Sequence, residues 1–475
     1  MVPLNNLSLP QLKSDVHAAL KHWHSVDDKS KHLLSNLLLV QNKRRSLGPP
    51  TPSALRLATN KVLLEGLEQL ENQHPQAAAI LQKRFLDQKN ILKVSQQLHL
   101  TVDQVKHHQR DALLQLANIL YAQEVKVREV FITSQESQLE ARSYTKLFGV
   151  DGLSEKLLTL LSAAQSPWVI TLSGIGGIGK TSLANHTVRQ SIRCLNYEEV
   201  IWLKIANQGK KSAPPLARPE HTFHQIINNL SKRLLPALPG DLAWEDRVQQ
   251  LQQLLKNQSF LIVIDNLELR ADTTFLLAEL VAMAQPSRFL LTSRIPPADH
   301  AGSLTIYLPE LSEADSIALI RHYAGEIGFT EAAAANQEEL LPIYQLVGGN
   351  PFALKQLVNL AKFRPLPGLL ASLKKHPLGD GEEIYRHILK ETWLTLSDEA
   401  KAVLAIMPLA AEGGMDPEQI LELSGLPQEH LWPAINELIG RSLLEVKTSN
   451  IWDRFYGIHR LTELFIRSLL DDDDI

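Results

Sequence analysis

The sequence contains a single cysteine, Cys194, among its 475 residues. One cysteine excludes internal disulfides and cysteine-rich zinc sites, and it is typical of a reducing cytosol. No apolar run approaches the roughly 20 residues that a membrane-spanning helix needs. Met1 to Pro10 also lack the basic start and the continuous apolar core of a signal peptide. These absences predict a cytoplasmic protein with no membrane partner.

The length and the charge distribution suggest several domains of different character. A chain of 475 residues is too long for one ordinary core. The net charge is −4, yet residues 1–130 hold 17 Lys and Arg against 11 Asp and Glu. A basic first quarter joined to an acidic remainder predicts that only the front of the chain meets a polyanion, although an ordinary solvated surface would give the same counts.

Short β-prone runs alternate with helical stretches in the middle of the chain. The five runs are 168–173, 200–205, 260–264, 288–292 and 304–308. This alternation predicts a parallel sheet with helices on both faces. After Pro309 the chain is expected to be mainly helical, with a small hairpin around 443–446 and 455–458.

A glycine-rich segment, Gly174-Ile-Gly-Gly-Ile-Gly-Lys-Thr181, follows the first of these runs and precedes a helix. It matches the phosphate-loop pattern G-x-x-x-x-G-K-[ST] in the context that such a loop requires. Glycines let backbone N–H groups surround a phosphate, the lysine adds a mobile cation, and the threonine hydroxyl suits magnesium. We therefore predict ATP or ADP with Mg²⁺ as ligands. The predicted nucleotide-binding residues of the loop are Gly174, Gly176, Gly177, Ile178, Gly179, Lys180, Thr181 and Ser182.

Two further strand ends carry polar groups that fit the same chemistry. The apolar run that precedes Asp265 ends in a carboxylate, which a buried strand tolerates only at a site. We predict that Asp265 holds magnesium together with Thr181. Asn266 or Glu268 would orient the attacking water, although Glu268 could equally be a solvated loop carboxylate. Arg294 follows the next strand and would stabilise the γ-phosphate.

The order of these motifs resembles that of the STAND NTPases, signal-transduction ATPases that include the NB-ARC proteins. The resemblance rests on the phosphate loop, Ile-Asp-Asn-Leu-Glu at 264–268, Leu-Thr-Ser-Arg at 291–294 and Gly-Gly-Asn-Pro-Phe-Ala-Leu at 348–354. It covers about residues 145–470. It implies a P-loop α/β core, a helical lid and a winged-helix domain.

The resemblance also implies roles for single residues. The family's G-x-P motif matches Gly349-Asn350-Pro351, whose proline would pack near the adenine, and its histidine motif matches His459, which would contact the β-phosphate of ADP. Val150, which follows Gly149 before the first predicted strand, stands where the family usually has an arginine. Adenine recognition by that arginine is therefore not expected here. Family members commonly continue into sensor repeats, whereas this sequence stops at Ile475. We therefore expect sensing to lie elsewhere, on a separate partner or on a longer form of the chain.

The front of the chain has the pattern of a helix-turn-helix. Residues 77–113 form three helical units that resemble region 4 of sigma-70-type factors, with Thr101 as the cap of the recognition helix. Gln104, Lys106, His107 and Arg110 would lie on its exposed side and suit double-stranded DNA. Docking of a protein and a plain helical bundle remain alternatives.

The predicted fold class is therefore multidomain: an α/β P-loop NTPase core with a helical lid and a winged-helix domain, preceded by an all-α helix-turn-helix domain. The predicted boundaries are 1–48 for an N-terminal helical segment, 53–125 for the helix-turn-helix, 126–144 for a linker, 145–308 for the nucleotide-binding domain, 309–378 for the lid and 379–475 for the winged helix.

The function we expect is an ATP/ADP-dependent switch of a bacterial signalling or transcription regulator. It would hydrolyse ATP slowly, form a homo-oligomer in the ATP state, and couple nucleotide state to the N-terminal module. The alternative is a nucleotide-binding scaffold whose N-terminal domain docks proteins, for example in bacterial defence.

Overall fold

The computed structural model describes most of the chain, and its helices and strands group into two compact units. The described residues are 8–24, 34–47, 51–165, 167–204, 219–239, 242–267, 270–294, 296–297, 300–374, 381–410, 414–441, 443–446 and 453–471. Unit 1 comprises residues 1–136 with 191–196, and unit 2 comprises residues 137–190 with 197–475. Among the described residues, no helix is both long and apolar enough to cross a membrane.

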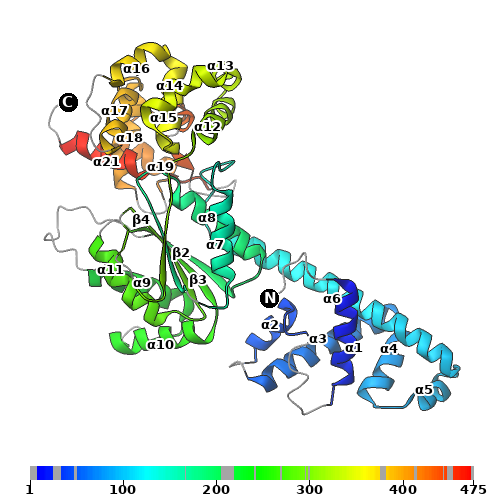
Figure 1. Ribbon diagram of the computed structural model, residues 1–475. Helices are drawn as coiled ribbons and strands as arrows, with labels where there is room; N and C mark the ends of the chain where they lie inside the picture. Colours follow the sequence, from blue (N-terminus) through cyan, green and yellow to red (C-terminus); the bar gives the residue numbers. More distant parts are fainter. Residues whose placement is uncertain are drawn as a thin grey trace. The chain divides into compact units, whose positions relative to one another are not determined.

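Unit 1 is helical throughout its described residues (Figure 1). Its elements are α1 (Leu9–Lys21), α2 (Leu38–Arg45), α3 (Pro52–Gln73), α4 (Pro75–Leu81), the π-helical turn η3 (Gln82–Leu86), α5 (Ile91–Leu98) and α6 (Val102–Ser137). The core of α1 to α4 packs on the apolar side of α6. The fully buried Glu124 of α6 accepts the backbone N–H groups of Leu38 and Leu39, and it also pairs with the buried Arg128. One carboxylate thus satisfies the first turn of α2 and an arginine that would otherwise be a buried unpaired charge.

The predicted helix-turn-helix segment lies in α4 to α6. Ile80, Val94 and Val105 form its small core. The turn between α5 and α6 contains no glycine. It is made by His99, whose φ of 55° lies in the left-handed region. Thr101 and Gln104 then satisfy each other's backbone N–H groups at the start of α6, as a capping box does.

The structure differs from the expected linker at 126–144. Helix α6 continues without a break to Ser137, so the first part of that segment is helical. The sequence there shows weak periodicity because polar residues such as Glu124, Arg128 and Gln135 occupy buried positions in place of apolar ones. Only the residues after Ser137 connect the helix to the next element.

Unit 2 contains a five-stranded parallel sheet in the order β2-β3-β4-β1-β5. The strands are β1 (Val169–Ser173), β2 (Glu199–Lys204), β3 (Phe260–Leu267), β4 (Arg288–Ser293) and β5 (Ser303–Tyr307). α9 (Pro219–Leu234), α10 (Trp244–Asn257) and α11 (Arg270–Met283) share a core with one face, and α7 (Asp151–Ser162) and α8 (Lys180–Arg193) lie on the other (Figure 1). All residues of β1 and β4 are buried, as expected for central strands covered on both sides.

The remainder of unit 2 is a helical assembly with one small antiparallel pair of strands. Its helices are α12 (Glu313–Glu326), α13 (Thr330–Ala334), α14 (Gln337–Val347), α15 (Pro351–Phe363), α16 (Leu366–Lys374), α17 (Gly381–Leu394), α18 (Asp398–Ile406), the 3₁₀ turn η4 (Met407–Leu409), α19 (Pro417–Ser424), α20 (Gln428–Gly440) and α21 (Arg460–Asp471). The strands β6 (Glu445–Val446) and β7 (Tyr456–Gly457) match the expected hairpin. One apolar core runs from Leu311 to Ile466, so the segments predicted as lid and winged helix pack together. The winged-helix assignment and the boundary at 378 stay predictions.

Candidate nucleotide site

The glycine loop connects the buried end of β1 to the first turn of α8. Gly177 and Gly179 have φ values of 75° and 102°, a region that side chains strain to adopt. A Cβ atom at Gly177 would also lie 2.7 Å from the Cβ of Phe352. Ile178 is buried and anchors the loop, whereas Ser182 lies in the first turn of α8 and lines the pocket. The glycines are therefore required both by the backbone conformation and by the neighbouring chain.

Lys180 and Thr181 begin α8 at the mouth of this loop. The Lys180 ammonium donates to the carbonyl oxygens of Gly174 at 2.8 Å and Ile175 at 3.0 Å. The Thr181 hydroxyl donates to Oδ1 of Asp265 at 2.9 Å. The N-terminal end of α8 adds its partial positive charge at the same place. A cation, a hydroxyl and a helix N-terminus thus converge on one loop, as anion binding requires.

Asp265 lies in β3, where the strand leaves regular pairing with β4. Its side chain is only 1% exposed, and it accepts hydroxyl hydrogens from Thr181 and from Thr292 of β4. Burial raises the pKa of the Asp265 carboxyl, and the two hydroxyls and the Lys204 charge offset part of that rise. Thr292 has no separate signal in the sequence, although it stands in the Leu-Thr-Ser-Arg motif. Such an oxygen-rich pair, a carboxylate beside a threonine hydroxyl, fits the ligand preference of Mg²⁺.

Asn266 and Arg294 come to the same edge of the sheet. Asn266 has a φ of 71°, and its backbone N–H donates to the Thr292 hydroxyl at 2.9 Å. The Arg294 guanidinium lies beside the loop, since a Cβ atom at Gly176 would be 3.6 Å from its Cζ. Both side chains line the same pocket as Lys180. Glu268 lies outside the described residues.

The Gly-Gly-Asn-Pro segment fastens α15 to the glycine loop. The buried Asn350 caps α15 by accepting the N–H groups of Phe352 and Ala353. Its Nδ2 also donates to the carbonyl of Gly176 at 2.9 Å. Pro351 is the first residue of the helix and lines the pocket. Pro351 is predicted from the sequence, whereas the bridging role of Asn350 is not, because an N-cap signal does not reveal a distant partner.

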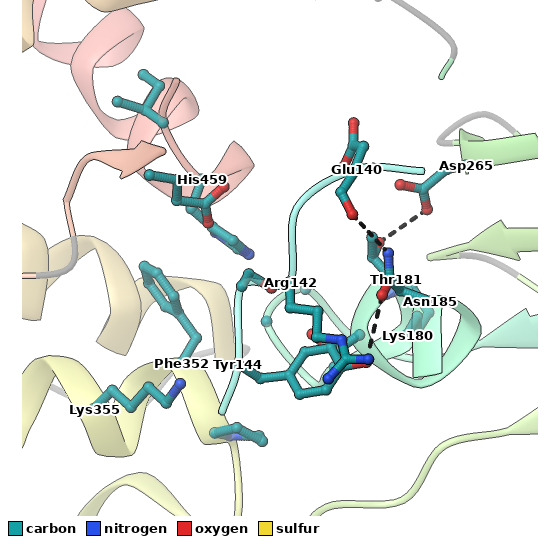
Figure 2. A pocket seen from close by; sticks show the side chains of 18 of the residues that line it. Glu140, Arg142, Tyr144, Lys180, Thr181, Asn185, Asp265, Phe352, Lys355 and His459 are labelled. Atoms are coloured by element: carbon teal, nitrogen blue, oxygen red, sulfur yellow. Dashed lines mark hydrogen bonds between the residues drawn. The ribbon is translucent and has the colours of Figure 1, made fainter. Parts of the chain in front are cut away.

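His459 reaches the site from the segment that leads into α21. Its ring stacks on Phe352 with ring centres 4.4 Å apart and planes 21° apart (Figure 2). The backbone N–H of Leu461 donates to His459 Nδ1 at 3.2 Å, so a neutral ring carries its proton on Nε2. The Leu461 side chain also lies beside the loop, 3.1 Å from where a Cβ of Gly176 would be. The C-terminal helices therefore contact both the glycine loop and α15.

Residues 138–145, which we call the connecting strap, follow α6, and residues 140–145 of the strap line the pocket, a position with no signal in the sequence. The carbonyl of Glu140 accepts hydrogen bonds from Asn185 at 3.2 Å and from Arg189 at 2.7 Å. The Tyr144 hydroxyl donates to Asn185 Oδ1 at 3.4 Å. The strap is thus bound to α8, the helix that follows the phosphate loop.

Together these segments enclose a pocket of about 590 Å³. Its size is within the range of small-molecule sites, roughly 300–1,000 Å³. The sheet supplies Asp265, Thr292 and Arg294, the loop supplies Lys180 and Thr181, and the helical assembly supplies Pro351, Phe352, Lys355 and His459. Burial lowers the pKa of Lys355, whose ammonium lies 5.3 Å from the centre of the Tyr323 ring.

The predicted DNA-binding residues lie in unit 1, at the start of α6. Gln104, Lys106, His107 and Arg110 are all exposed. Gln104 is occupied by the capping box, Lys106 pairs with Asp103 at 3.0 Å, and His107 pairs with Asp111 at 3.3 Å. DNA binding stays a prediction.

A model of the NB-ARC domain family matches residues 150–321. The disease resistance protein RGA2 of Solanum bulbocastanum is 23% identical over 349 residues, which cover 69% of this chain and 32% of RGA2. The regulatory protein AfsR of Streptomyces coelicolor is 26% identical over 187 residues, which cover 39% of this chain and 17% of AfsR. The chain therefore spans about a third or less of the length of these relatives.

Among solved structures, the chain is similar to a STAND protein with a tetratricopeptide repeat sensor from Pyrococcus horikoshii. That similarity covers 70% of this chain and 44% of the other, at 17% identity and a TM-score of 0.46. The matched family segment begins at the turn before α7 and ends within α12, so it contains the glycine loop, Asp265 and Arg294. Residues 150–321 therefore match the NB-ARC domain family, a nucleotide-binding domain, while the match does not extend over the remainder of the chain.

Proposed function

We propose that the chain is an ATP/ADP-dependent switch that hydrolyses ATP slowly at the glycine loop. The observation that carries this proposal is the convergence of the Lys180 ammonium, the Thr181 hydroxyl and the buried Asp265 carboxylate on one loop. A buried carboxylate is costly unless it serves a charged partner. A metal-bound triphosphate is the partner that explains all three groups at once.

Each group has a defined part in the proposed reaction. The backbone N–H groups of the loop and Lys180 would hold the β- and γ-phosphates, and Arg294 would stabilise the charge that develops during transfer. Thr181 and Asp265 would hold Mg²⁺, which supplies charge neutralisation across the phosphate oxygens. Asn266 is our candidate to orient the attacking water. As the water oxygen bonds to the γ-phosphorus, the bond between the γ-phosphorus and the bridging β-phosphate oxygen breaks. ADP then leaves with that oxygen, and the water proton passes to phosphate or solvent.

The helical assembly supports a switch rather than a fast enzyme. Asn350, Phe352 and Leu461 contact the loop from elements that lie far along the chain. In our proposal the ADP form keeps these contacts closed, with His459 near the β-phosphate and Pro351 near the base. ATP would loosen them and expose surface for a homo-oligomer or for a separate sensor or effector protein.

Two measurements test the proposal. The nucleotide released from the purified protein by denaturation is expected to be ADP. Lys180→Ala removes a charge-assisted contact worth roughly 1.5–3 kcal/mol, so it should weaken ADP and ATPγS binding by roughly 10–100-fold. Lys156→Ala, an exposed lysine of α7, is the matched control and should bind normally. Equal binding by Lys180→Ala would refute the site, and fast hydrolysis by the unaltered protein would refute the switch.

We further propose that the α5–α6 unit of unit 1 contacts double-stranded DNA. The left-handed His99 turn and the exposed Lys106 and Arg110 support this proposal. Removing one cation that neutralises a phosphate should reduce the salt slope of binding by about 0.9. The double variant Lys106→Ala/Arg110→Ala should therefore flatten the salt dependence of duplex binding, while Lys126→Ala on the same helix should flatten it less. Absence of duplex binding at low salt would favour the protein-docking scaffold instead.

A further inference from the structure

An ion pair stands at the rim of the pocket, on the side of the proposed metal site. Lys204 ends β2 and is in register with Asp265 of the neighbouring strand β3. Its ammonium lies 3.2 Å from Oε1 of Glu140, a residue of the connecting strap. Both side chains are partly exposed, 30% for Lys204 and 28% for Glu140, and both line the pocket. Neither residue takes part in the proposed hydrolysis.

Hydrogen bonds fix the backbone of Glu140, which limits the positions that its carboxylate can take. Its carbonyl accepts hydrogen bonds from Asn185 and Arg189, which lie on α8 shortly after Thr181. Figure 2 shows Glu140 and Asp265 on the same side of the pocket, where the Glu140 carbonyl accepts from Asn185 and the Asp265 carboxylate accepts from Thr181. The Glu140 charge also contributes to the raised pKa of Asp265, and the Lys204 charge opposes that rise. Two carboxylates and one lysine are therefore electrostatically coupled at this edge.

This edge is where the last phosphate of a triphosphate would lie. Thr181 and Asp265 would hold the metal that neutralises the charge of the phosphates, so the γ-phosphate of a bound triphosphate would lie toward these two residues. ADP lacks that group. A lysine at this edge would therefore gain a strong partner only with ATP, and a carboxylate there would meet a like charge only with ATP.

We propose that Lys204 is a second phosphate-binding lysine, specific for the γ-phosphate, and that Glu140 is the counter-charge which competes with the γ-phosphate for it. The inference rests on the proposed function and adds the residues that distinguish ATP from ADP. With ADP, the Lys204–Glu140 pair stays closed. With ATP, Lys204 turns to the γ-phosphate and Glu140 loses its partner. Because the strap follows Ser137 directly, the exchange acts on the covalent connection between α6 and the nucleotide domain.

Affinity measurements for Mg-ATPγS and Mg-ADP test the pair directly. Glu140→Gln removes the competing charge and should raise the ratio of ATPγS affinity to ADP affinity about tenfold, within the usual range of coupling between sites. Lys204→Met should lower this ratio by about the same factor. In the double variant the ratio should equal that of Lys204→Met, because Glu140 acts through the lysine. Glu199→Gln is the matched control, since Glu199 begins the same strand and pairs with Arg233 at 2.8 Å with similar exposure.

Hydrogen exchange of the strap gives a second measurement that does not depend on a variant. Amides of residues 138–145 should exchange faster with Mg-ATPγS bound than with Mg-ADP bound. An unchanged affinity ratio in both single variants, or equal exchange in the two nucleotide states, would overturn the inference while leaving the proposed function intact. A chain that binds neither nucleotide would instead overturn the proposed function, and the inference with it.

Discussion

At the scale of single residues, the site depends on what surrounds each polar atom. Asp265 is a carboxylate with almost no exposure, and two hydroxyls are aimed at the same oxygen. Burial raises its pKa, so protonation competes with cation binding more effectively than at an exposed aspartate. In the proposed site a cation would have to compete with this proton, so we expect nucleotide affinity to depend on magnesium.

The substitution Asp265→Asn should separate folding from cation binding. The amide oxygen can still accept both hydroxyls, so the free energy of unfolding should fall little or rise, because a desolvated charge is removed. Affinity for Mg-ATPγS should fall by at least roughly 10–100-fold, the range that loss of a residue supporting a metal ligand already costs. Titrations with and without magnesium check this. If Asp265→Asn keeps the full magnesium dependence, Asp265 is not a metal ligand.

At the scale of elements, the start of α15 joins two parts of unit 2. Asn350 caps the helix and donates to the carbonyl of Gly176, so one buried side chain fixes both the helix and the loop. Asn336 caps α14 in a comparable way, with Glu339 completing a capping box, but it is exposed and is not among the residues that line the pocket. Both asparagines therefore cap a helix, and Asn350 in addition donates a hydrogen bond to the distant Gly176.

Comparing alanine variants of these two asparagines should isolate the distant hydrogen bond. Loss of the helix cap alone should lower the unfolding free energy of each variant by roughly 1 kcal/mol. Asn350→Ala should lower it by more, up to about 3 kcal/mol in total, because the Gly176 carbonyl is also left without its donor. Only Asn350→Ala should weaken ADP binding. Chemical denaturation and nucleotide titration measure the two effects, and equal nucleotide affinity in both variants would contradict a role of Asn350 in shaping the loop.

At the scale of the whole molecule, contacts between distant segments define the nucleotide pocket. The connecting strap, the sheet edge, α15 and the segment before α21 all contribute to it. The stacked pair of Phe352 and His459 joins the last two of these. Their separation would open the pocket on the side of the helical assembly.

His459→Ala should therefore speed the release of bound ADP. An aromatic pair contributes about 0.5–1.5 kcal/mol, so removing the stacking alone should raise the dissociation rate roughly 2–10-fold. Stopped-flow displacement of a fluorescent ADP analogue measures the rate. His430→Ala, an exposed histidine of α20 that pairs with Glu399, should leave it unchanged. An unchanged rate in His459→Ala would argue against closure by this histidine.

Local signals in the sequence determined the phosphate loop, the parallel sheet and the order of the strand ends. These depend on short-range chemistry: glycines where the backbone turns, apolar runs where strands are buried, and Asp265 where a buried strand ends in a charge. Only the tertiary structure revealed Thr292, Asn350 and the connecting strap as parts of the site. Their roles come from partners more than 20 residues away along the chain, as with Glu140 and Lys204 or Asn350 and Gly176. The same reason explains why the linker predicted at 126–144 includes the last turns of α6, because the buried polar residues of this helix are stabilised by pairs such as Glu124 and Arg128, which hydrophobic periodicity does not detect.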